Sequence, residues 1–409
     1  MNILERFLSY VAFDTQSRED KDSFPSTEGQ WRLLTHLAEE LRDMGVTDVR
    51  QDKKYGYVYG VIPSNCLGKV IPAVGFIAHV DTSDAMSGAD IKPRLIENYD
   101  GKDIVLNEEL GIVTRILDFP AMKSLAGKHI LVTDGTTLLG ADDKAGVTEI
   151  MEMVSFVMSH PEFLHGNICI AFTPDEEIGR GVDYFSIPDF GADYAYTVDG
   201  GRLGEISCEN FNAASAKVTF YGRSVHPGDA KGKMIHAVLL AQEFERLLPE
   251  KEKPQFTEER EGFYHIISLH GDCEKAVCNY IIREHDLDLF EQRKDYFSNC
   301  VEKLNKKMGY EVARLEMEDS YYNMAGIIAR HPRVMEHAKN AMIKLGIEPR
   351  VTPIRGGTDG ARLSFSGLPC PNLCTGGGNF HGKHEYVCLE EMEQTIKLLL
   401  GILTEYANE

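Results

Sequence analysis

The chain has 409 residues, a length that suggests two domains. Hydrophobic residues make up 43% of it and charged residues 26%, without low-complexity tracts, which is typical of a globular protein and excludes extended disorder. The formal net charge is −21, and the acidic residues are spread along the chain. This charge argues against binding to nucleic acid or to an anionic membrane surface.

The cysteines indicate a reducing compartment. There are nine of them, an odd number, and none forms a Cys-X-X-Cys pair. This favours free thiols in a cytoplasmic protein over a disulfide framework. The N-terminal residues show no basic segment followed by an apolar core, and no apolar stretch approaches the roughly 18 residues of a membrane span. We therefore expect a cytoplasmic protein with neither membrane nor nucleic acid as a partner.

The N-terminal region predicts ordinary α/β elements. Residues 3–12 predict a short amphipathic helix. Thr27 and Gln30 have the spacing of a capping box, and the helix that they would open reaches about Met44, with Trp31 on its apolar face. Three strands are predicted next, near 48–52, 56–63 and 70–79.

The third of these strands ends in two residues able to contact a metal. It runs into Phe-Ile-Ala-His79-Val-Asp81. Side chains alternate along a strand, so His79 and Asp81 project to the same side at its carboxyl end, where open α/β sheets bind their ligands. The pattern suits a metal-bound histidine with a carboxylate beside it. Taken alone, it also fits a strand that runs into a polar loop.

An acidic pair lies before the next long helix. Residues 84–137 show no long periodic run and are expected to be irregular. They lead into Gly-Ala-Asp142-Asp143-Lys, and a helix follows over about 144–160. Taken alone, the two aspartates also fit the N-cap of that helix.

Two more apolar strands end in acidic residues. A strand over 167–173 runs into Pro-Asp-Glu176-Glu177-Ile-Gly, and one over 194–198 runs into Asp199-Gly-Gly. Three strands that each end in acids or histidine indicate the active edge of a mostly parallel sheet. Taken alone, the glutamate pair also fits a solvated loop, and the aspartate with its two glycines fits a turn.

After residue 201 the order of elements changes. The predicted elements are a strand over 213–221, a helix over 232–248, strands over 263–270 and 276–283, a helix over 287–307 and a strand over 310–316. This βαββαβ order is that of a ferredoxin-like unit. We therefore expect residues 212–321 to form an α+β domain, inserted into an α/β domain made of residues 1–211 and 322–409.

The α/β pattern resumes at the C-terminal end. A helix over 332–345 and a closing helix over 389–407 flank Asn-Phe-His381-Gly-Lys-His384-Glu. Either histidine could reach the strand ends. The glycines just before them lack the strand-GxGxxG-helix context of a phosphate loop, which favours a tight turn that brings a histidine to the site. The expected fold is α/β, a mixed and mostly parallel sheet flanked by helices.

Carboxylates and imidazoles gather at the predicted strand ends. The candidates are His79, Asp81, Asp142, Glu176, Glu177, Asp199 and His381. Such ligands without thiolate are typical of a catalytic zinc, cobalt or manganese site and not of a structural zinc site. They exceed the needs of one ion, so two ions that share a bridging carboxylate are the economical arrangement. Because neighbours cannot both face one metal from a regular strand, one of the paired glutamates is expected to bind metal and the other to act as a base for hydrolysis.

Seven ordered motifs resemble those of the co-catalytic dinuclear-zinc metallopeptidases. They are Phe-Ile-Ala-His79-Val-Asp81-Thr, Gly-Ala-Asp142-Asp-Lys-Ala-Gly, Thr-Pro-Asp-Glu176-Glu177-Ile-Gly, Val-Asp199-Gly-Gly, Val-His226-Pro-Gly, Gly-Gly-Thr-Asp-Gly-Ala and Asn-Phe-His381-Gly-Lys-His-Glu. The resemblance spans essentially the whole chain, and the joint match is specific where any single motif would not be. Within the family it is similar to the aminopeptidases that act on tripeptides.

The resemblance implies a ligand set for two zinc ions per chain. His79 and Asp199 would hold one ion, and Glu177 and His381 the other, with Asp142 as the bridge. Co²⁺ and Mn²⁺ are alternatives to zinc at such sites.

The resemblance also implies roles for residues beside the metals. Asp81 would orient His79 through its second ring nitrogen, and Glu176 would be the general base that takes a proton from water and returns it to the leaving amine. The peptide bond between Asp142 and Asp143 would be cis.

In this family the inserted domain mediates dimerisation and closes over the substrate. His226 is therefore a candidate for stabilising the tetrahedral oxyanion, and Asn279 for bonding the substrate backbone. Arg283 and Arg355 are candidates for binding the free carboxylate of a short peptide. Without the resemblance, the histidine would be an ordinary loop residue and the arginines ordinary ion-pair partners.

The residues and the resemblance together predict a cytoplasmic, homodimeric two-zinc aminopeptidase that removes the N-terminal residue from tripeptides and acts in peptide catabolism. One alternative is an amidohydrolase of the same architecture, such as a carboxypeptidase, a dipeptidase or an N-acyl amino acid deacylase, with the same metals and a different pocket. A second is a metal-binding or interaction protein on the same scaffold without catalysis. The intact Glu176 argues against that second alternative, because such a protein has no use for a base there.

Overall fold

The computed structural model describes residues 2–66 and 68–409. These residues form two compact units. The larger unit comprises Met1–Cys208, Gly326–Thr352 and Thr358–Glu409, and the smaller comprises Glu209–Ala325 and Pro353–Gly357.

The division differs in detail from the boundaries expected at residues 211 and 321. The smaller unit begins and ends a few residues further out on both sides. It also includes the short segment Pro353–Gly357, which the sequence grouped with residues 322–409. Arg355 therefore belongs to the smaller unit.

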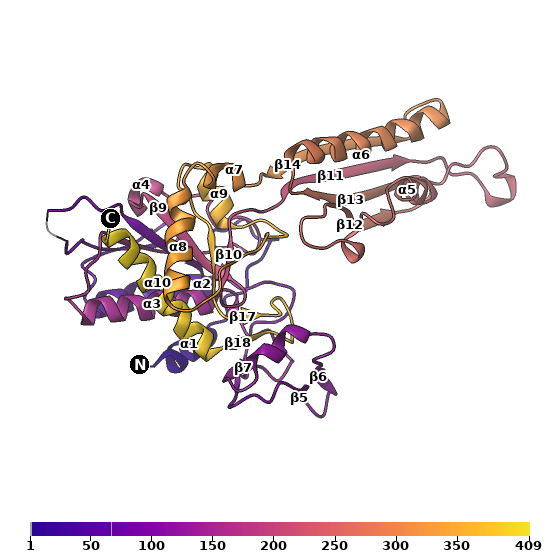
Figure 1. Cartoon of the computed structure of the whole chain (residues 1–409). Helices are drawn as coiled ribbons and strands as arrows, with labels where there is room; N and C mark the ends of the chain where they lie inside the picture. The colour runs from indigo at the N-terminus through magenta and orange to yellow at the C-terminus, as the bar shows by residue number, and fades with distance from the viewer. Residues whose placement is uncertain (1, 67) are drawn as a thin grey trace. The chain divides into compact units, whose positions relative to one another are not determined.

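A mixed sheet forms the centre of the larger unit (Figure 1). In spatial order its strands are β1 (Asp48–Gln51), β2 (Val58–Ile62), β8 (Ile168–Thr173), β3 (Val74–His79), β9 (Tyr194–Gly200), β16 (Asn372–Cys374), β10 (Glu205–Ser207) and β15 (Arg350–Val351). The run from β8 through β3 and β9 to β16 is parallel, and antiparallel pairs join β1, β2 and β10 to it. This arrangement confirms the predicted α/β class.

The larger unit also contains helices, and several of them pack against this sheet and cover its apolar strands. They are α1 (Ile3–Val11), α2 (Glu28–Asp43), α3 (Ala141–Ser159), α4 (Ile187–Phe190), α7 (Ala325–Ile328), α8 (Pro332–Lys344), α9 (Asp359–Phe365) and α10 (Leu389–Ala407). Every residue of β3 and β8 is buried, so these strands do not alternate and are apolar except for the polar residue that ends each of them, His79 and Thr173. Ile77 of β3, Phe190 of α4 and Leu363 of α9 belong to one apolar cluster.

The helix α2 begins differently from the expected capping box. Thr27 is its N-cap residue, but the Thr27 side chain makes no capping hydrogen bond. The Gln30 amide donates to the Thr27 hydroxyl at 3.1 Å instead of accepting from the Thr27 backbone N–H, and it also pairs with the buried Asp175 of another segment. Trp31 is half-buried, and the buried face of the helix contains Leu33 in its place. The expected capping box was therefore wrong.

Residues 84–137 were expected to be irregular, and this was also wrong. They contain β4 (Arg94–Ile96), β5 (Ile104–Asn107), β6 (Ile112–Thr114), the 3-10 helix η1 (Pro120–Leu125) and β7 (Ile130–Val132). The strands β4 and β7 form an antiparallel sheet with β17 (Gly377–Gly378) and β18 (Tyr386–Cys388). Strands of three or four residues are too short to show a period, and half of this sheet comes from a distant part of the chain.

The smaller unit has the predicted βαββαβ order. Its elements are β11 (Asn212–Tyr221), η2 (Pro227–Asp229), α5 (Ala237–Glu245), η3 (Pro254–Phe256), β12 (Phe263–Gly271), β13 (Lys275–Glu284), α6 (Leu287–Met308) and β14 (Ala313–Tyr321). The strands form an antiparallel sheet in the order β12-β13-β11-β14, as in a ferredoxin-like unit. The helix α5 is shorter than the predicted 232–248.

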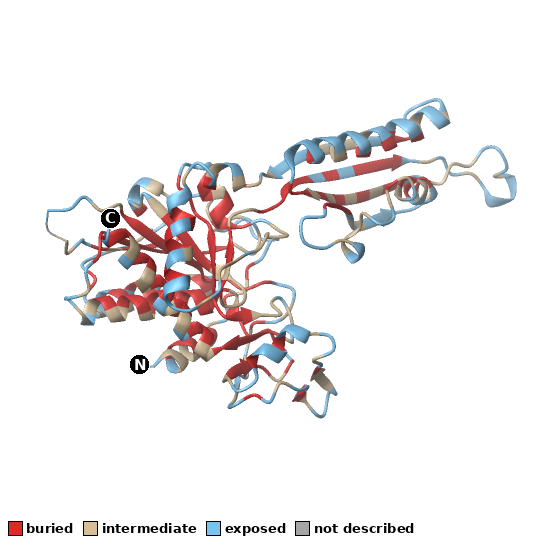
Figure 2. Ribbon diagram, in the orientation of Figure 1, coloured by how far each residue is buried: buried red, intermediate tan, exposed pale blue. Residues whose placement is uncertain are grey.

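The α6 helix and the β13 strand show how this sheet is covered. Alternate residues of β13, from Ala276 to Ile282, are buried against the helices, and α6 buries one side while its other side faces solvent (Figure 2). This regular alternation made the smaller unit predictable from sequence.

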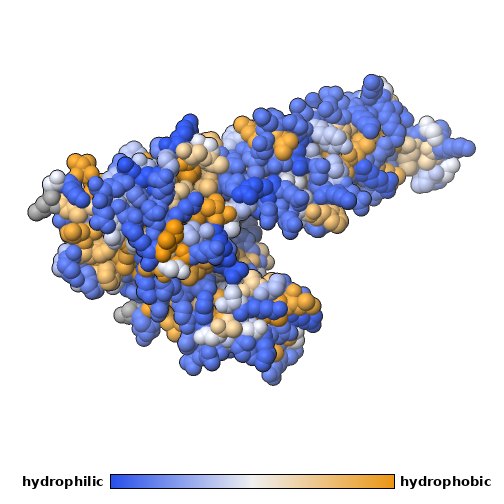
Figure 3. Space-filling view, in the orientation of Figure 1, coloured by the Kyte–Doolittle hydropathy of each residue, from blue (hydrophilic) through white to orange (hydrophobic). Residues whose placement is uncertain are grey.

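The surface and the cysteines agree with the composition. On the face drawn in Figure 3, hydrophilic residues cover most of each unit, and hydrophobic residues form small separate patches. None of the nine cysteines is joined to another in a disulfide. Among the described residues, no helix is both long and apolar enough to cross a membrane.

Gly75 offers a test of how tightly the sheet is packed. A Cβ atom at this position of β3 would lie 2.4 Å from the Phe190 ring, which is itself fully buried. Because that ring has no room to move, we expect Gly75→Ala to lower the free energy of unfolding by about 1–3 kcal/mol. Urea unfolding measures this loss. The control is Gly326→Ala, since a Cβ there meets no atom within 4 Å; equal stability of the two variants would contradict the expected packing.

Candidate metal centre

His79 closes strand β3 in the parallel part of the sheet. His79 and Asp81 are 3% and 0% exposed. As the alternation predicts, they face each other: His79 Nδ1 lies 3.3 Å from Asp81 Oδ1 and 3.1 Å from the Asp81 carbonyl oxygen. These contacts on Nδ1 leave Nε2 directed toward the other candidate ligands.

The neighbouring strands bring their acids to the same edge. The strands β8 and β9 flank β3 and are parallel to it, so their carboxyl ends meet beside His79. Glu176 and Glu177 follow β8, and Asp199 lies near the end of β9. His79 Nε2 is 3.4 Å from Asp199 Oδ1.

Asp142 lies at the start of α3, where the backbone is not yet helical. Its φ and ψ are −87° and 104°, and its peptide bond to Asp143 is cis, as expected. Gly146 allows this end of the helix to approach β9 closely. A Cβ atom at Gly146 would lie 1.8 Å from the carbonyl oxygen of Val198, so only glycine fits. The close approach sets Asp142 beside the carboxyl end of β9.

His381 completes the group from the loop after β17. His381 Nε2 is 3.1 Å from Asp142 Oδ2 and 2.9 Å from Glu177 Oε2. His79 Nε2 is 3.0 Å from the other oxygen of that aspartate, Oδ1. Asp142 therefore offers one carboxylate oxygen to each histidine, as a bridging ligand would.

His384 does not join this group. His384 Nδ1 lies 2.9 Å from Thr114 Oγ1, and its ring packs against Phe119 with centroids 5.0 Å apart. The residues alone left open which histidine reaches the strand ends, and the resemblance favoured His381; in the structure it is His381.

Burial shifts the pKa values of these groups. It raises the pKa of Glu177 to about 7 and that of Asp199 to about 6. Asp142 shifts the other way, because its hydrogen bonds to both histidines outweigh burial and hold its pKa below the usual range. Hydrogen bonds to Asp142 and Glu177 raise the pKa of His381 to about 11. For His79, burial opposes protonation, but the facing aspartates outweigh it and raise its pKa well above the ordinary value.

This donor set fits divalent metal ions. Carboxylate and imidazole groups face one another at hydrogen-bond distance, and among the described residues no lysine or arginine forms an ion pair with Asp142, Glu177 or Asp199. Glu177 Oε1 is buried and has no hydrogen-bond partner, which is rare unless an unseen ligand supplies one. Cations in the middle would neutralise the acids and accept the lone pairs of neutral imidazoles.

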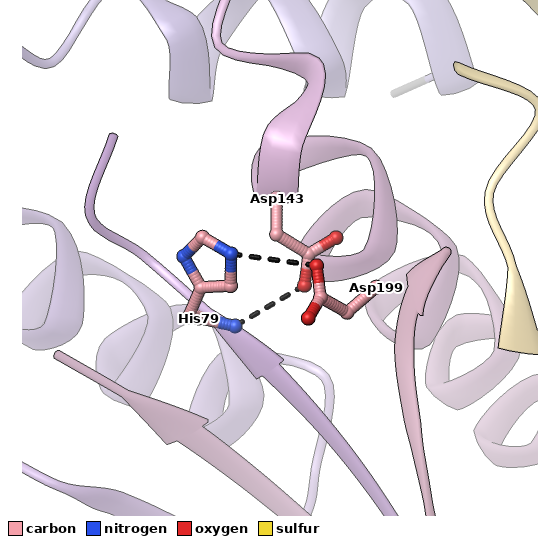
Figure 4. A group of neighbouring side chains, drawn as sticks. All are labelled: His79, Asp143 and Asp199. Atoms are coloured by element: carbon pink, nitrogen blue, oxygen red, sulfur yellow. Dashed lines mark hydrogen bonds and ion pairs between the residues drawn. The ribbon is translucent and has the colours of Figure 1, made fainter. Parts of the chain in front are cut away.

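Two overlapping sets of three residues have ligand atoms within 4.8 Å of one another, His79 with Asp142 and Glu177, and His79 with Asp143 and Asp199. Figure 4 draws the second set, in which Asp199 faces the imidazole ring while Asp143 points to the backbone nitrogen of His79. The Asp143 carboxylate accepts hydrogen bonds from the N–H groups of His79, at 3.2 Å, and Gly146, at 3.3 Å. We therefore interpret Asp143 as a brace between β3 and α3 and not as a ligand.

Asp81 also holds the glutamate pair. Its two carboxylate oxygens accept hydrogen bonds from the backbone N–H groups of Glu176, at 3.0 Å, and Glu177, at 3.1 Å. The Glu176 carboxylate itself makes no hydrogen bond or ion pair with any described residue, and burial raises its pKa well above the usual range. A carboxyl group that is free of partners beside a metal centre is suited to accept a proton.

The four proposed substrate contacts all lie in the smaller unit, where each has a local partner. His226 Nδ1 accepts a hydrogen bond from the N–H of Gly228 in its own turn, and Asn279 donates to Ser268 Oγ. Arg283 donates to the carbonyls of Ala214 and Ile282, and its guanidinium lies over the Tyr321 ring. Arg355 donates to the carbonyls of Glu259, Glu261 and Thr257, so most of its donors are already engaged.

Glu385 is a site residue that the sequence did not single out. It is 2% exposed, and its carboxylate accepts hydrogen bonds from the N–H groups of Leu139 at 2.6 Å, Gly140 at 2.9 Å and Asp142 at 3.1 Å. It thereby ties the loop of Asp142 to the loop of His381. The only signal was its place at the end of the histidine motif.

Asp359 is a second buried acid that the sequence quoted in a motif without a role. Thr173 Oγ1 donates to its carboxylate at 3.2 Å, and a Cβ atom at Gly181 would lie 2.4 Å from both of its oxygens. Burial raises the pKa of Asp359 to about 7. It lies behind the strand ends, and nothing in the sequence distinguishes it from a helix N-terminal acid.

Comparison with known proteins decides the family. Residues 132–405 match peptidase family M20/M25/M40. The chain belongs to this family. It is 52% identical over 407 residues to "Peptidase T" of Caldanaerobacter subterraneus, with 100% of this chain and 99% of that protein covered. It is 51% identical over 406 residues to "Peptidase T" of Clostridium novyi, with 99% of each covered.

Solved structures of M20-type peptidases share the fold. The aminopeptidase PepT of Bacillus cereus has a TM-score of 0.77 at 23% identity, covering 100% of this chain and 98% of that one. A dinuclear metal-binding peptidase of the M20 family from Bacillus subtilis has a TM-score of 0.63 at 11% identity, covering 98% and 96%. At these identities the likeness concerns the fold alone.

Glu385 provides a test of how the metal centre is held. In Glu385→Ala, three backbone N–H groups around Asp142 lose their acceptor, and the Asp142 carboxylate loses its fixed position. We expect divalent metal affinity to fall by about 10-fold or more, measured by competition with a chelator. The control is Glu393→Ala, at an exposed position of the helix α10. Equal metal affinity of the two variants would contradict this role.

Proposed function

We propose that the chain is a metal-dependent aminopeptidase that releases the N-terminal residue of tripeptides. The observation that carries the proposal is Asp142, which offers one oxygen to His79 and one to His381. It occurs in a chain about half identical to proteins named Peptidase T. We also propose a homodimer formed through the smaller unit, on the family resemblance, and a cytoplasmic location, which the free cysteines support.

Two zinc ions would be held by the five convergent side chains. His79 and Asp199 would bind one ion, Glu177 and His381 the other, and Asp142 both, with Co²⁺ or Mn²⁺ as alternatives. When bound, the ions supply Lewis-acid polarisation of the peptide carbonyl and acidify a water molecule. Asp81 fixes His79 for this purpose, because its contact with Nδ1 keeps Nε2 aimed at the site.

Glu176 would be the general base. Its backbone is fixed by Asp81, its carboxylate is free of partners, and burial raises its pKa well above the usual range, which makes it a stronger proton acceptor than an exposed glutamate. It would take the proton of the attacking water and return it to the amine that leaves as the peptide bond breaks.

The smaller unit would contribute the substrate contacts. His226 would stabilise the oxyanion, Asn279 would bond the peptide backbone, and Arg283 would bind the free carboxylate. Arg355 is the weaker of the two arginine candidates, because its guanidinium already donates to three backbone carbonyls.

Removal of Glu176 tests the role of the base. In Glu176→Ala, all five proposed metal ligands are still present, so we expect both ions to remain bound while kcat falls by about 10²–10⁴-fold. Metal analysis and tripeptide hydrolysis on the same sample measure both effects. Asp189→Ala, on the exposed part of α4, is the control. Loss of metal in Glu176→Ala would mean that the roles of the two glutamates are reversed.

Blocking the substrate's amino group tests the substrate class. We expect a tripeptide with a free N-terminus to be hydrolysed, its N-acetylated form to be turned over at least about 10²-fold more slowly, and a chelator to abolish hydrolysis. Solved structures that share this fold at 12% and 13% identity include a metallo-carboxypeptidase and a dipeptidase. The same assay distinguishes an aminopeptidase from these two activities. Equal turnover of the acetylated tripeptide would exclude an aminopeptidase and favour a deacylase or a carboxypeptidase.

A further inference from the structure

Side chains hold every backbone N–H group of the segment that carries the glutamate pair. The N–H of Asp175 donates to Gln30 Oε1 at 3.0 Å. The next two N–H groups, of Glu176 and Glu177, donate to the two oxygens of Asp81. Three consecutive peptide units are thus fixed from two sides, by the end of β3 and by the first turn of α2.

The Asp175 side chain completes this attachment to α2. It is 0% exposed, and its carboxylate accepts hydrogen bonds from Gln30 Nε2 at 2.7 Å, from the Ser26 N–H at 2.7 Å and from the Ser26 hydroxyl. Gln30 therefore both donates to Asp175 and accepts from it. The three residues are 0–5% exposed, so water does not replace these bonds.

Asp175 needs such support. Its φ is 57°, in the left-handed region that residues other than glycine rarely adopt and that persists only where the surroundings impose it. Since Glu176 follows directly, a change in the backbone of Asp175 changes the direction in which the next side chain leaves the chain.

We propose that Gln30 and Ser26 are positioning residues that hold Glu176 in its reactive orientation by acting through Asp175. This inference rests on the proposed function, in which Glu176 is the general base. A displacement of about 1 Å at a reacting group is enough to lower the rate about 100-fold. The buried hydrogen bonds of Gln30 and Ser26 to Asp175 therefore affect kcat by fixing the position of the base.

Thr27 gives the contrast that isolates this role. Gln30 Nε2 is also 3.1 Å from Thr27 Oγ1, the contact that a helix-capping role would use. Thr27 has no bond to Asp175. If Gln30 serves only the start of α2, loss of Thr27 and loss of Gln30 have similar effects; if it positions the base, only the loss of Gln30 affects catalysis.

The experiment compares Gln30→Met, Ser26→Ala and Thr27→Ala with the full-length wild type. Methionine keeps the length of the glutamine side chain and removes both its donor and its acceptor. At saturating zinc we expect kcat to fall about 10–100-fold in Gln30→Met and about 3–10-fold in Ser26→Ala, with KM changed less than about 3-fold and two ions retained. Thr27→Ala keeps wild-type kcat.

A second readout does not depend on activity. Crystal structures of the metal-free proteins are expected to have the Glu176 carboxylate displaced in Gln30→Met and in place in Thr27→Ala. The proposal is overturned if Gln30→Met, or Ser26→Ala where the first variant does not fold, keeps kcat within twofold per folded molecule. It is also overturned if residues 175–177 in the crystal structure of Gln30→Met superpose on those of the wild type.

Failure of the proposed function gives a different result. If the wild type hydrolyses no free tripeptide but cleaves another amide, the tripeptidase proposal is wrong, and the ratio of kcat values on that amide decides the positioning role. If the wild type cleaves no amide, the positioning inference fails with the proposed function, whatever the crystal structures are.

Discussion

The structure depends on the shared carboxylate of Asp142. Two imidazoles approach its two oxygens, at 3.0 Å from His79 and 3.1 Å from His381, and a further acid approaches the same nitrogen of each imidazole. Buried acids this close repel one another and are costly to desolvate, so the arrangement persists only if positive charge lies among them. The close packing of α3 against β9, which permits no side chain at Gly146, places this aspartate beside the carboxyl end of β9.

Three more buried acids keep the ligand-bearing segments in register. Asp143 bonds the N–H of His79, Asp81 bonds the N–H groups after β8, and Glu385 bonds the loop that leads to Asp142. Each of them uses its carboxylate for backbone N–H groups, which are dipoles of fixed direction, so each defines the position of a whole segment. The acids at this edge therefore divide into those that face the candidate metal centre and those that bond the backbone of the segments around it.

A feature of the fold or the site could be predicted where the residues that determine it are close together in the sequence. The alternation of His79 and Asp81 on a strand and the period of β13 are local, and sequence was sufficient for both. Gln30 has the spacing of a capping box, but the partner that decides its role, Asp175, is 145 residues away. The short strands of residues 84–137 and the bonds of Glu385 likewise depend on distant partners, which no local pattern reports.

All five proposed metal ligands come from the larger unit, although the chain leaves that unit between Cys208 and Gly326. The smaller unit supplies none of them, and it carries His226, Asn279 and Arg283, the proposed contacts to substrate. Hydrolysis of an amide requires only the metals and a base, whereas the choice of amide requires groups that recognise its ends. If these proposed contacts hold, substitutions in the smaller unit can change the substrate and leave the five proposed metal ligands unchanged. Solved structures that share this fold include an aminopeptidase, a metallo-carboxypeptidase and a dipeptidase.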